Sequence, residues 1–166
     1  MLPENVINRL PYQLMGALNF PDYKFNIRDN DGVKEIYDRV RQKFVALQPE
    51  EIVRQNMTEF MISEMGYPMQ KIGNEVTVEI NGMRKRCDSV VYGSDFRPRM
   101  ILEYKAPTVM ITQQVFDQIL TYNTRLKVRY LTVSNGLQHI YCRISSDHDV
   151  TFLRNLPSYT VLDDDI

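Results

Sequence analysis

Two carboxylates and a lysine lie close together near the middle of the chain, in a segment that predicts a β-hairpin. Residues 86–92 and 99–105 are rich in β-branched, aromatic and other apolar side chains, which favours two strands. The six residues between them, from Gly93 to Pro98, carry the glycine, serine, aspartate and proline typical of turns. The cross-strand pairs that this loop implies are Tyr92 with Arg99, Val90 with Ile101, and Asp88 with Glu103.

The pairing of Asp88 with Glu103 predicts a metal site. Directly opposed side chains have Cβ atoms about 5 Å apart, and two like charges at that distance are destabilising unless a cation lies between them. Alternation along the strand places Lys105 on the same face as Glu103. The two carboxylates could bind Mg²⁺, or Mn²⁺ in its place. With a lysine beside them, such a site could hydrolyse a phosphodiester. Lys105 would orient the attacking water or stabilise charge on the phosphate. A cross-strand salt bridge on a solvated face is the alternative.

The composition limits the classes of function. A length of 166 residues with 43% hydrophobic residues suits one domain with a sizeable core. The net charge of −1 argues against a generally basic nucleic-acid binder, so a phosphate backbone would need a local basic patch. Cys87 and Cys142 lie in predicted strands without zinc-site spacing and are expected to be small buried hydrophobes. The sequence shows no signal peptide, membrane-spanning run or Walker loop, which predicts a cytoplasmic protein without its own nucleotide-driven motor.

The first half of the chain predicts an arm, a hairpin and a helix. Residues 1–22 are broken by prolines and suggest a loosely packed arm, and residues 23–37 alternate around a turn, as expected of edge strands. Residues 39–43 form a basic connection, either solvated or in contact with phosphate. A helix is expected from Pro49 to about Met65. Three polar residues near its start lie off the apolar side and serve either as helix-end electrostatics or in an active-site cleft: Glu51, Arg54 and Gln55.

The second half predicts a three-stranded meander followed by a strand, helix, strand unit. Residues 72–80 and the Asn81-Gly82 turn precede the Asp88 strand, which begins with a basic triplet. This triplet is predicted to be the local basic patch, against the alternative of charge displayed at a strand end. Its residues are Arg84, Lys85 and Arg86.

A helix is expected over 113–126 with Thr112 as its N-cap, and strands over 128–134 and 138–144. The right-handed crossover implies a parallel strand pair in a mixed sheet with one helix on each face. Residues 163–165 predict a solvated acidic tail, which bounds a core domain of residues 23–155 before a tail of residues 156–166. The buried side of the helix is predicted to be Val115, Phe116, Ile119, Leu120 and Leu126, and a second line that could touch substrate is Gln114, Gln118 and Tyr122.

The Asp, spacer, Glu-x-Lys arrangement is similar to that of the PD-(D/E)xK nuclease superfamily, with Cys87 in place of the nominal proline. Five segments extend this similarity: PEEIVRQ (49–55), GMRKRCDSVVY (82–92), EYKAP (103–107), QILTY (118–122) and VSNG (133–136). Together they resemble the N-terminal nuclease domain of type I restriction enzyme R (HsdR) subunits. They resemble more closely the small free-standing bacterial proteins built from that domain alone. The resemblance covers residues 23–155.

The resemblance implies an α/β, restriction-endonuclease-like fold, a mixed β-sheet flanked by helices, that cuts double-stranded DNA with Mg²⁺. Asp88 and Glu103 match the metal carboxylates, and Lys105 matches the catalytic lysine. Gln118 and Tyr122 match the Gln-x-x-x-Tyr element near the nuclease centre. Glu51 lies where the first core helix of the superfamily often carries an acidic residue.

The family also suggests partners. Its R subunits work joined to a helicase, and partner subunits supply specificity, so DNA and a separate helicase, ATPase or specificity subunit are expected here. Cutting both strands with one site per chain suggests a homodimer. Two alternatives remain open. The chain could bind nucleic acid through residues 84–86 and Gln118 without chemistry, or it could be an assembly subunit of a restriction or defence complex.

Overall fold

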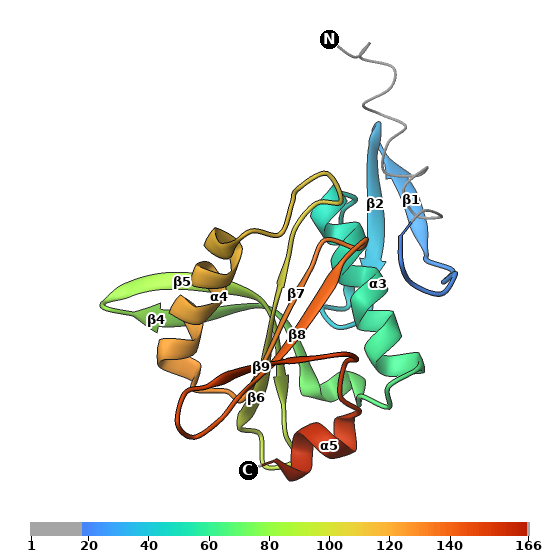
Figure 1. Ribbon diagram of the computed structural model, residues 1–166. Coiled ribbons are helices and arrows are strands. Elements are labelled where there is room, and N and C mark those ends of the chain that lie inside the picture. The colour runs from blue at the N-terminus through green and yellow to red at the C-terminus, as the bar shows by residue number, and fades with distance from the viewer. Residues whose placement is uncertain (1–17, 166) are drawn as a thin grey trace.

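The computed structural model describes residues 18–165, which form two β-sheets and the helices around them (Figure 1). Most of the predicted N-terminal arm therefore lies outside the described residues. The strands are β1 (Ile27–Asn30), β2 (Val33–Asp38), β3 (Lys43–Ala46), β4 (Ile72–Ile80), β5 (Met83–Tyr92), β6 (Pro98–Tyr104), β7 (Tyr130–Ser134), β8 (His139–Ile144) and β9 (Val150–Leu153). The helices are α3 (Pro49–Ser63), the short 3₁₀ turn η1 (Met69–Lys71), α4 (Gln113–Leu126) and α5 (Tyr159–Asp164).

The larger sheet has six strands in the order β4-β5-β6-β7-β8-β9. Strands β6 and β7 run parallel, because α4 connects them as a crossover, and the other neighbouring pairs are antiparallel. The predicted mixed sheet is therefore confirmed. The bounds of β4 and α4 are those predicted, and the turn between β4 and β5 has positive φ at both Asn81 (51°) and Gly82 (74°). A type I′ turn requires this conformation, so the hairpin prediction is also confirmed.

The two long helices cover opposite faces of this sheet, as predicted. Val53 and Met57 of α3 pack in one core cluster with Met100 and Leu102 of β6. Because side chains alternate along a strand, Ile101 points to the other face, where it joins the cluster beneath α4. On α4, Val115 and Ile119 are buried and Phe116 and Leu126 are partly buried, as expected. Leu120 was wrongly placed on the buried side, because its side of the helix faces solvent and leaves it 36% exposed.

The first three strands form a separate sheet in the order β1-β2-β3. The predicted hairpin exists, but the expectation that it would add edge strands to the main sheet was wrong, since its next partner is β3. The small sheet is tied to the large one by a buried carboxylate, Asp38. Asp38 accepts hydrogen bonds from the backbone N–H groups of Val40 and Arg41 and from Asn74 Nδ2 of β4 (3.1 Å).

The C-terminal residues are packed against the large sheet rather than solvated as predicted. Residues 159–164 form α5, where Leu162 is fully buried. Asp163 Oδ1 accepts a hydrogen bond from the Ser94 N–H (2.8 Å). Asp165 pairs with Arg129 and Arg143, at 2.6 and 2.7 Å. Two arginines distant in the sequence, one just before β7 and one in β8, therefore hold Asp165 in place, whereas Asp164 is exposed.

The two cysteines match their predicted role, and both are free and buried. Within residues 18–165, no helix combines the length and the apolar character needed to span a bilayer.

Gly136, in the predicted turn between β7 and β8, occupies a position that only glycine suits. Its φ is +84°, and an added Cβ would lie 2.8 Å from Leu18 Cδ2. We expect Gly136→Ala to lower the free energy of unfolding by about 2–4 kcal/mol, because backbone strain and overpacking combine. Gly32→Ala is the matched control, since Gly32 has φ +85° but no atom within 4 Å of its added Cβ. Urea unfolding that gave equal losses for the two variants would contradict the role of crowding.

Candidate functional site

Asp88 and Glu103 lie where β5 and β6 begin to separate. The observed pairs Ser89–Leu102, Val90–Ile101 and Val91–Met100 confirm the predicted register, and Asp88 and Glu103 are the next residues along. Just beyond the last of these pairs, the Tyr104 N–H donates to the carboxylate of Asp88 (2.8 Å). The side chain of Asp88 therefore connects the two strands where their pairing ends.

The far end of the same hairpin departs from the prediction. Tyr92 pairs with Pro98, and not with Arg99, because an irregularity between Val91 and Tyr92 shifts the register by one residue. A β-bulge absorbs one extra residue in this way and changes the pairing only beyond it. The pairs beside the site keep the predicted register.

Glu103 is the centre of a compact cluster of polar side chains. It is 3% exposed, and its Oε1 accepts hydrogen bonds from Lys105 Nζ (3.0 Å) and Gln118 Nε2 (2.7 Å). Gln118 Oε1 also accepts from Lys105 Nζ (3.2 Å), and Gln118 Nε2 lies 3.5 Å from the hydroxyl of Tyr122. The strand β6 and the helix α4 thus bring together four residues that the sequence placed at the site.

The electrostatics of this cluster favour a cation. Burial, followed by the negative charge of Asp88, raises the pKa of Glu103 to about 7. Burial opposes the charge on Lys105, but its hydrogen bond and attraction to Glu103 prevail and raise the pKa of the ammonium group. Lys105 is therefore held as a cation, suited to stabilising negative charge on a substrate.

Asp88 pairs with a cation from α3, the helix on the opposite face of the sheet from α4. Arg54 of α3 is 5% exposed and lies 3.3 Å from Asp88 Oδ1 through its Nη2 atom. Burial raises the pKa of Asp88, and the Tyr104 N–H and Arg54 offset this only in part. The predicted site residues Asp88 and Glu103 are thus both carboxylates whose ionised form is costly without added positive charge.

Glu51 is buried and positions Arg54, and it does not lie at the open face of the site. Its carboxylate accepts hydrogen bonds from Arg54 (2.6 Å) and Gln55 (2.8 Å) at the buried start of α3, and from Arg41 (2.5 Å), which lies between β2 and β3. Glu51 is therefore joined to Asp88 through Arg54. Arg41, in the predicted basic connection, is taken up by ion pairs with Asp38 and Glu51 and is not a free phosphate contact.

Glu75 is a residue that sequence reasoning missed. It lies in β4 with φ of +58°, a rare conformation for a residue with a side chain. Its carboxylate pairs with Arg54 Nη2 (2.8 Å) and with Arg86 Nε (2.6 Å), so that Arg54 joins Glu75 to Asp88. The charged residue types of this strand were visible in the sequence, but no spacing rule connects residues 54, 75 and 88.

Other predicted contact residues lie farther from the cluster. Gln114 is exposed in the first turn of α4, and neither Glu103 nor Lys105 is its hydrogen-bond partner. Arg84, Lys85 and Arg86 are exposed on β5, beyond Asp88. They form part of the surface of the hairpin rather than of the buried cluster.

The residues present fit a Mg²⁺ ion held largely by water and two carboxylates. Within residues 18–165, no three His, Cys, Asp or Glu side chains are arranged to hold a metal by themselves. Mg²⁺ keeps several waters and commonly uses one or two carboxylates in sites that also bind phosphate. Asp88 and Glu103 supply the hard oxygen donors, and burial raises the pKa of both carboxylates.

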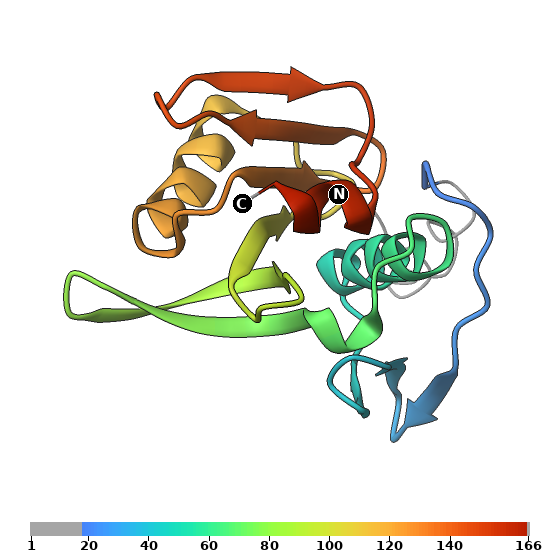
Figure 2. The ribbon, with the colours of Figure 1, turned by 90° about the horizontal axis from the view of Figure 1, so that it is seen from below.

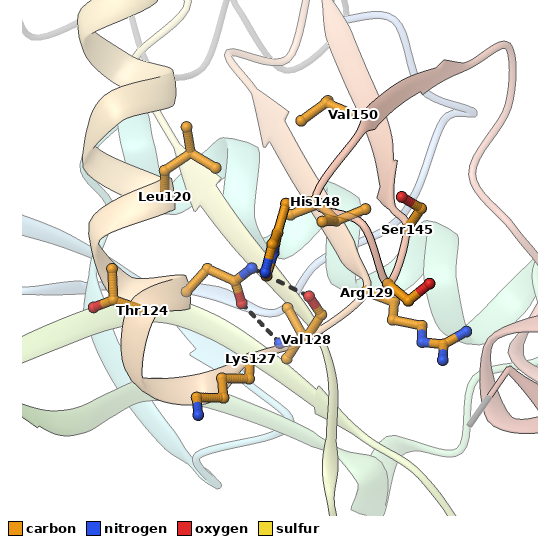
Figure 3. A pocket seen from close by; sticks show the side chains of 11 residues that line it. Leu120, Thr124, Lys127, Val128, Arg129, Ser145, His148 and Val150 are labelled. Carbon is orange, nitrogen blue, oxygen red and sulfur yellow. Dashed lines mark hydrogen bonds between the residues drawn. The ribbon is translucent and has the colours of Figure 1, made fainter.

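A cavity of about 510 Å³ lies apart from these residues, between the end of α4 and the β8–β9 turn (Figure 3). Leu120, His148 and Val150 border it, and the Asn123 side chain bonds both backbone groups of Val128 at its floor. None of the clustered carboxylates lines it. The candidate site and this cavity therefore lie at different parts of α4.

The comparisons with known proteins agree with this fold. No curated protein matches the chain. A solved fragment of an HsdR subunit of a type I restriction enzyme from Vibrio vulnificus YJ016, described as putative, superposes with a TM-score of 0.52 at 19% sequence identity. The match covers 69% of this chain and 24% of that one, so this chain spans about a quarter of the fragment's length. The family model for the type I restriction enzyme R protein N terminus (HSDR_N) matches residues 49–157. Because this match covers more than half of the chain, the chain belongs to the type I restriction enzyme R protein N-terminal family.

Proposed function

We propose that this chain is a Mg²⁺-dependent endonuclease domain that hydrolyses phosphodiester bonds in DNA. The observation that carries the proposal is a cluster in which Gln118 bonds both Glu103 and Lys105, while Asp88 accepts from the neighbouring Tyr104 N–H and its negative charge raises the pKa of Glu103. The family supports DNA as the substrate and a multisubunit restriction complex as the setting. A separate helicase, ATPase or specificity subunit remains part of this proposal.

The proposed reaction is the addition of water to phosphorus and the departure of one ester oxygen, which takes up a proton. When bound, Mg²⁺ would polarise the phosphate and acidify a bound water. Asp88 and Glu103 would hold the ion, and the Lys105 ammonium would stabilise the charge that builds up on the phosphate oxygens. Gln118 orients Lys105 and Glu103 by bonding both, and Tyr122 packs behind Gln118.

Metal binding tests the first part of the proposal. We expect Mn²⁺, followed by its electron paramagnetic resonance signal, to bind the protein and to compete with Mg²⁺. Asp88→Asn and Glu103→Gln should each weaken binding at least about tenfold, because each removes one charged ligand from a site with few others. Asp117→Asn is the control, since Asp117 is an exposed carboxylate on α4. Equal affinity in all of these variants would overturn the assignment of the site.

A non-catalytic nucleic-acid-binding module is the second candidate, favoured by the exposed cations of β5. Incubation of supercoiled plasmid with Mg²⁺ or with EDTA separates the two functions. The nuclease proposal expects nicked and linear DNA only with Mg²⁺. Binding without any nicking, in both conditions, would favour the second candidate.

A further inference from the structure

Strand β9 forms one edge of the six-stranded sheet. It pairs with β8 on one side, and among residues 18–165 no strand pairs with its other side. Figure 2 shows β9, in orange-red at the top, as the outermost strand of this sheet. The backbone N–H and C=O groups that point away from β8 can therefore pair with a further strand.

The edge at β9 carries little protection against such pairing. Proteins commonly blunt an edge with charged residues, proline or a β-bulge. β9 is short, but it consists of valine, threonine, phenylalanine and leucine, and it pairs with β8 without a shift in register. The opposite edge, β4, carries Glu75 and Glu79, and Glu75 has a positive φ. Of the two edges, β9 is thus the one better suited to adding a strand.

Two apolar side chains of β9 lie exposed on the face of the sheet that α4 covers. Val150 is 45% exposed and Phe152 is 67% exposed. Their partners on β8 are Ile144 and Cys142, which pack in the core beneath α4. The ring of Phe116 on α4 contacts that of Phe152 (6.1 Å between centroids), but most of the Phe152 side chain remains in solvent. A strand added beside β9 would cover these side chains.

The sequence of β9 is complementary to itself in an antiparallel pair. Directly opposed side chains lie on the same face of a sheet, so the two-fold axis of a symmetric pair passes beside a residue that faces its own copy. With Thr151 at the axis, Val150 faces Phe152 of the second copy, and Phe152 faces Val150 of the second copy. The exposed valine and phenylalanine of both copies then form one apolar row.

The charges at the two ends of β9 are also complementary. Asp147 and Asp149 precede the strand, Arg154 follows it, and all three side chains are exposed. None of them takes part in an ion pair within the part of the chain that the structure describes. In the antiparallel pair, Arg154 of the second copy lies level with His148, between the two aspartates. Two-fold symmetry repeats this contact at the other end, which favours a second copy over a strand of unrelated sequence.

We propose that two copies of this chain form a dimer by antiparallel pairing of β9, with Thr151 at the two-fold axis. The pairing joins the two large sheets into one continuous sheet and covers the apolar row. This inference goes beyond the proposed nuclease function and does not depend on it. It provides the interface for the homodimer expected from the sequence. Strands β7 and β8 separate β9 from the candidate residues on β6, so the pairing edge and the candidate site are distinct.

Sedimentation velocity over a range of protein concentrations tests the apolar row. We expect the wild-type protein to change from monomer to dimer as its concentration rises. Phe152→Glu should weaken the dimer at least about 100-fold, because each copy then places a charge in the row. Phe96→Glu is the matched control, since Phe96 is an exposed phenylalanine in the loop between β5 and β6, and it should leave the dimer unchanged. The urea unfolding midpoint checks that both variants fold.

The end charges test the antiparallel orientation. Arg154→Asp should weaken the dimer by about tenfold, because it places three acidic side chains together at each end of the joined strands. Adding Asp149→Arg to this variant should restore most of the affinity, since each end again combines opposite charges. Failure of this second change to restore the dimer would contradict the antiparallel pairing.

A Thr151→Cys variant tests the position of the axis. Directly opposed Cβ atoms lie about 5 Å apart, close to the distance that a disulfide requires. Diamide, which accepts the two electrons and two protons of the thiols, should therefore link two copies of this variant. Thr77→Cys is the control, since Thr77 is an exposed threonine on the opposite edge strand β4 and should stay unlinked. The native Cys87 and Cys142 are buried.

Three outcomes would overturn the β9 dimer. The first is a wild-type protein that stays monomeric at every concentration. The second is a dimer that Phe152→Glu weakens no more than Phe96→Glu, which would place the interface on another surface. The third is linking of Thr77→Cys as fast as Thr151→Cys, which would indicate chance collision. These measurements contain neither Mg²⁺ nor DNA, so their result is independent of nuclease activity.

Discussion

Lys105→Met is expected to reduce the rate of DNA hydrolysis by about 10²–10³-fold, the range for loss of one charged stabilising group at a reacting centre. The ammonium of Lys105 lies 3.0 Å from Glu103 and the side chain is 20% exposed, so it is positioned beside a proposed metal ligand and is still reachable by a phosphate. Methionine keeps the length and the apolar stem of the side chain. The expected loss is therefore one of charge rather than of packing.

The measurement is the single-turnover rate of plasmid nicking at saturating Mg²⁺. Saturation matters because Lys105 also lowers the pKa of Glu103, and its removal changes metal affinity as well. Lys34→Met is the control, since Lys34 is a half-exposed lysine on the small sheet. Lys105→Arg should retain part of the rate, because it keeps a charge with a different geometry. Full activity in Lys105→Met with an unchanged metal titration would contradict the proposed role.

Local patterns predicted the elements that carry the site. The apolar spacing and turn signals placed α4 and β4 within their observed bounds, and the loop length fixed the β5–β6 register beside Asp88. Since register and alternation are properties of adjacent residues, they also predicted that Glu103 and Lys105 share a face. Their hydrogen bond of 3.0 Å is consistent with that prediction.

The parts that could not be predicted depend on contacts between distant segments. Arg54 reaches Asp88 across a separation of 34 residues, and Asp165 pairs with Arg129 across 36. The side chains of β4 also depart from strict alternation, since Ile72 packs beneath α3 and Val78 beneath α4, with Glu75 in a positive-φ conformation between them. A non-glycine residue keeps this conformation only when its surroundings hold it, so the sequence of the strand alone does not predict it. The small sheet was misplaced for a similar reason, since periodicity predicts strands but not which sheet they join.

Arg54 is expected to contribute more to folding stability than any exposed ion pair of the chain. Its guanidinium pairs with Glu51 (2.6 Å), Glu75 (2.8 Å) and Asp88 (3.3 Å). Burial opposes its charge, but the carboxylates, Glu51 foremost, prevail and raise its pKa. Arg54→Met would leave these carboxylates in the protein interior without their shared cation. We expect the free energy of unfolding to fall by about 3–5 kcal/mol, the usual cost of breaking a buried ion pair from one side.

Arg39→Met is the matched control on the stability measurement. Arg39 pairs with Glu59 of α3 at 2.8 Å, but its side chain is 52% exposed, so the loss should be at most about 1 kcal/mol. Arg54→Lys keeps one charge and should fall between the two, which preserves the comparison if Arg54→Met does not fold. Equal midpoints of urea unfolding for the Arg54 and Arg39 variants would refute the shared-cation role.

The Arg54→Lys variant also tests whether Mg²⁺ binds at Asp88. Without Arg54, the Asp88 carboxylate has more need of a cation, so Mg²⁺ should raise the unfolding midpoint of Arg54→Lys more than that of the wild-type protein. Adding Asp88→Asn to this variant should abolish the extra stabilisation, because the ligand is then lost. If Mg²⁺ stabilised the double variant as strongly, the ion would be acting elsewhere. Arg54 would then neutralise Asp88 for folding alone, and the metal assignment would have to move away from the β5–β6 junction.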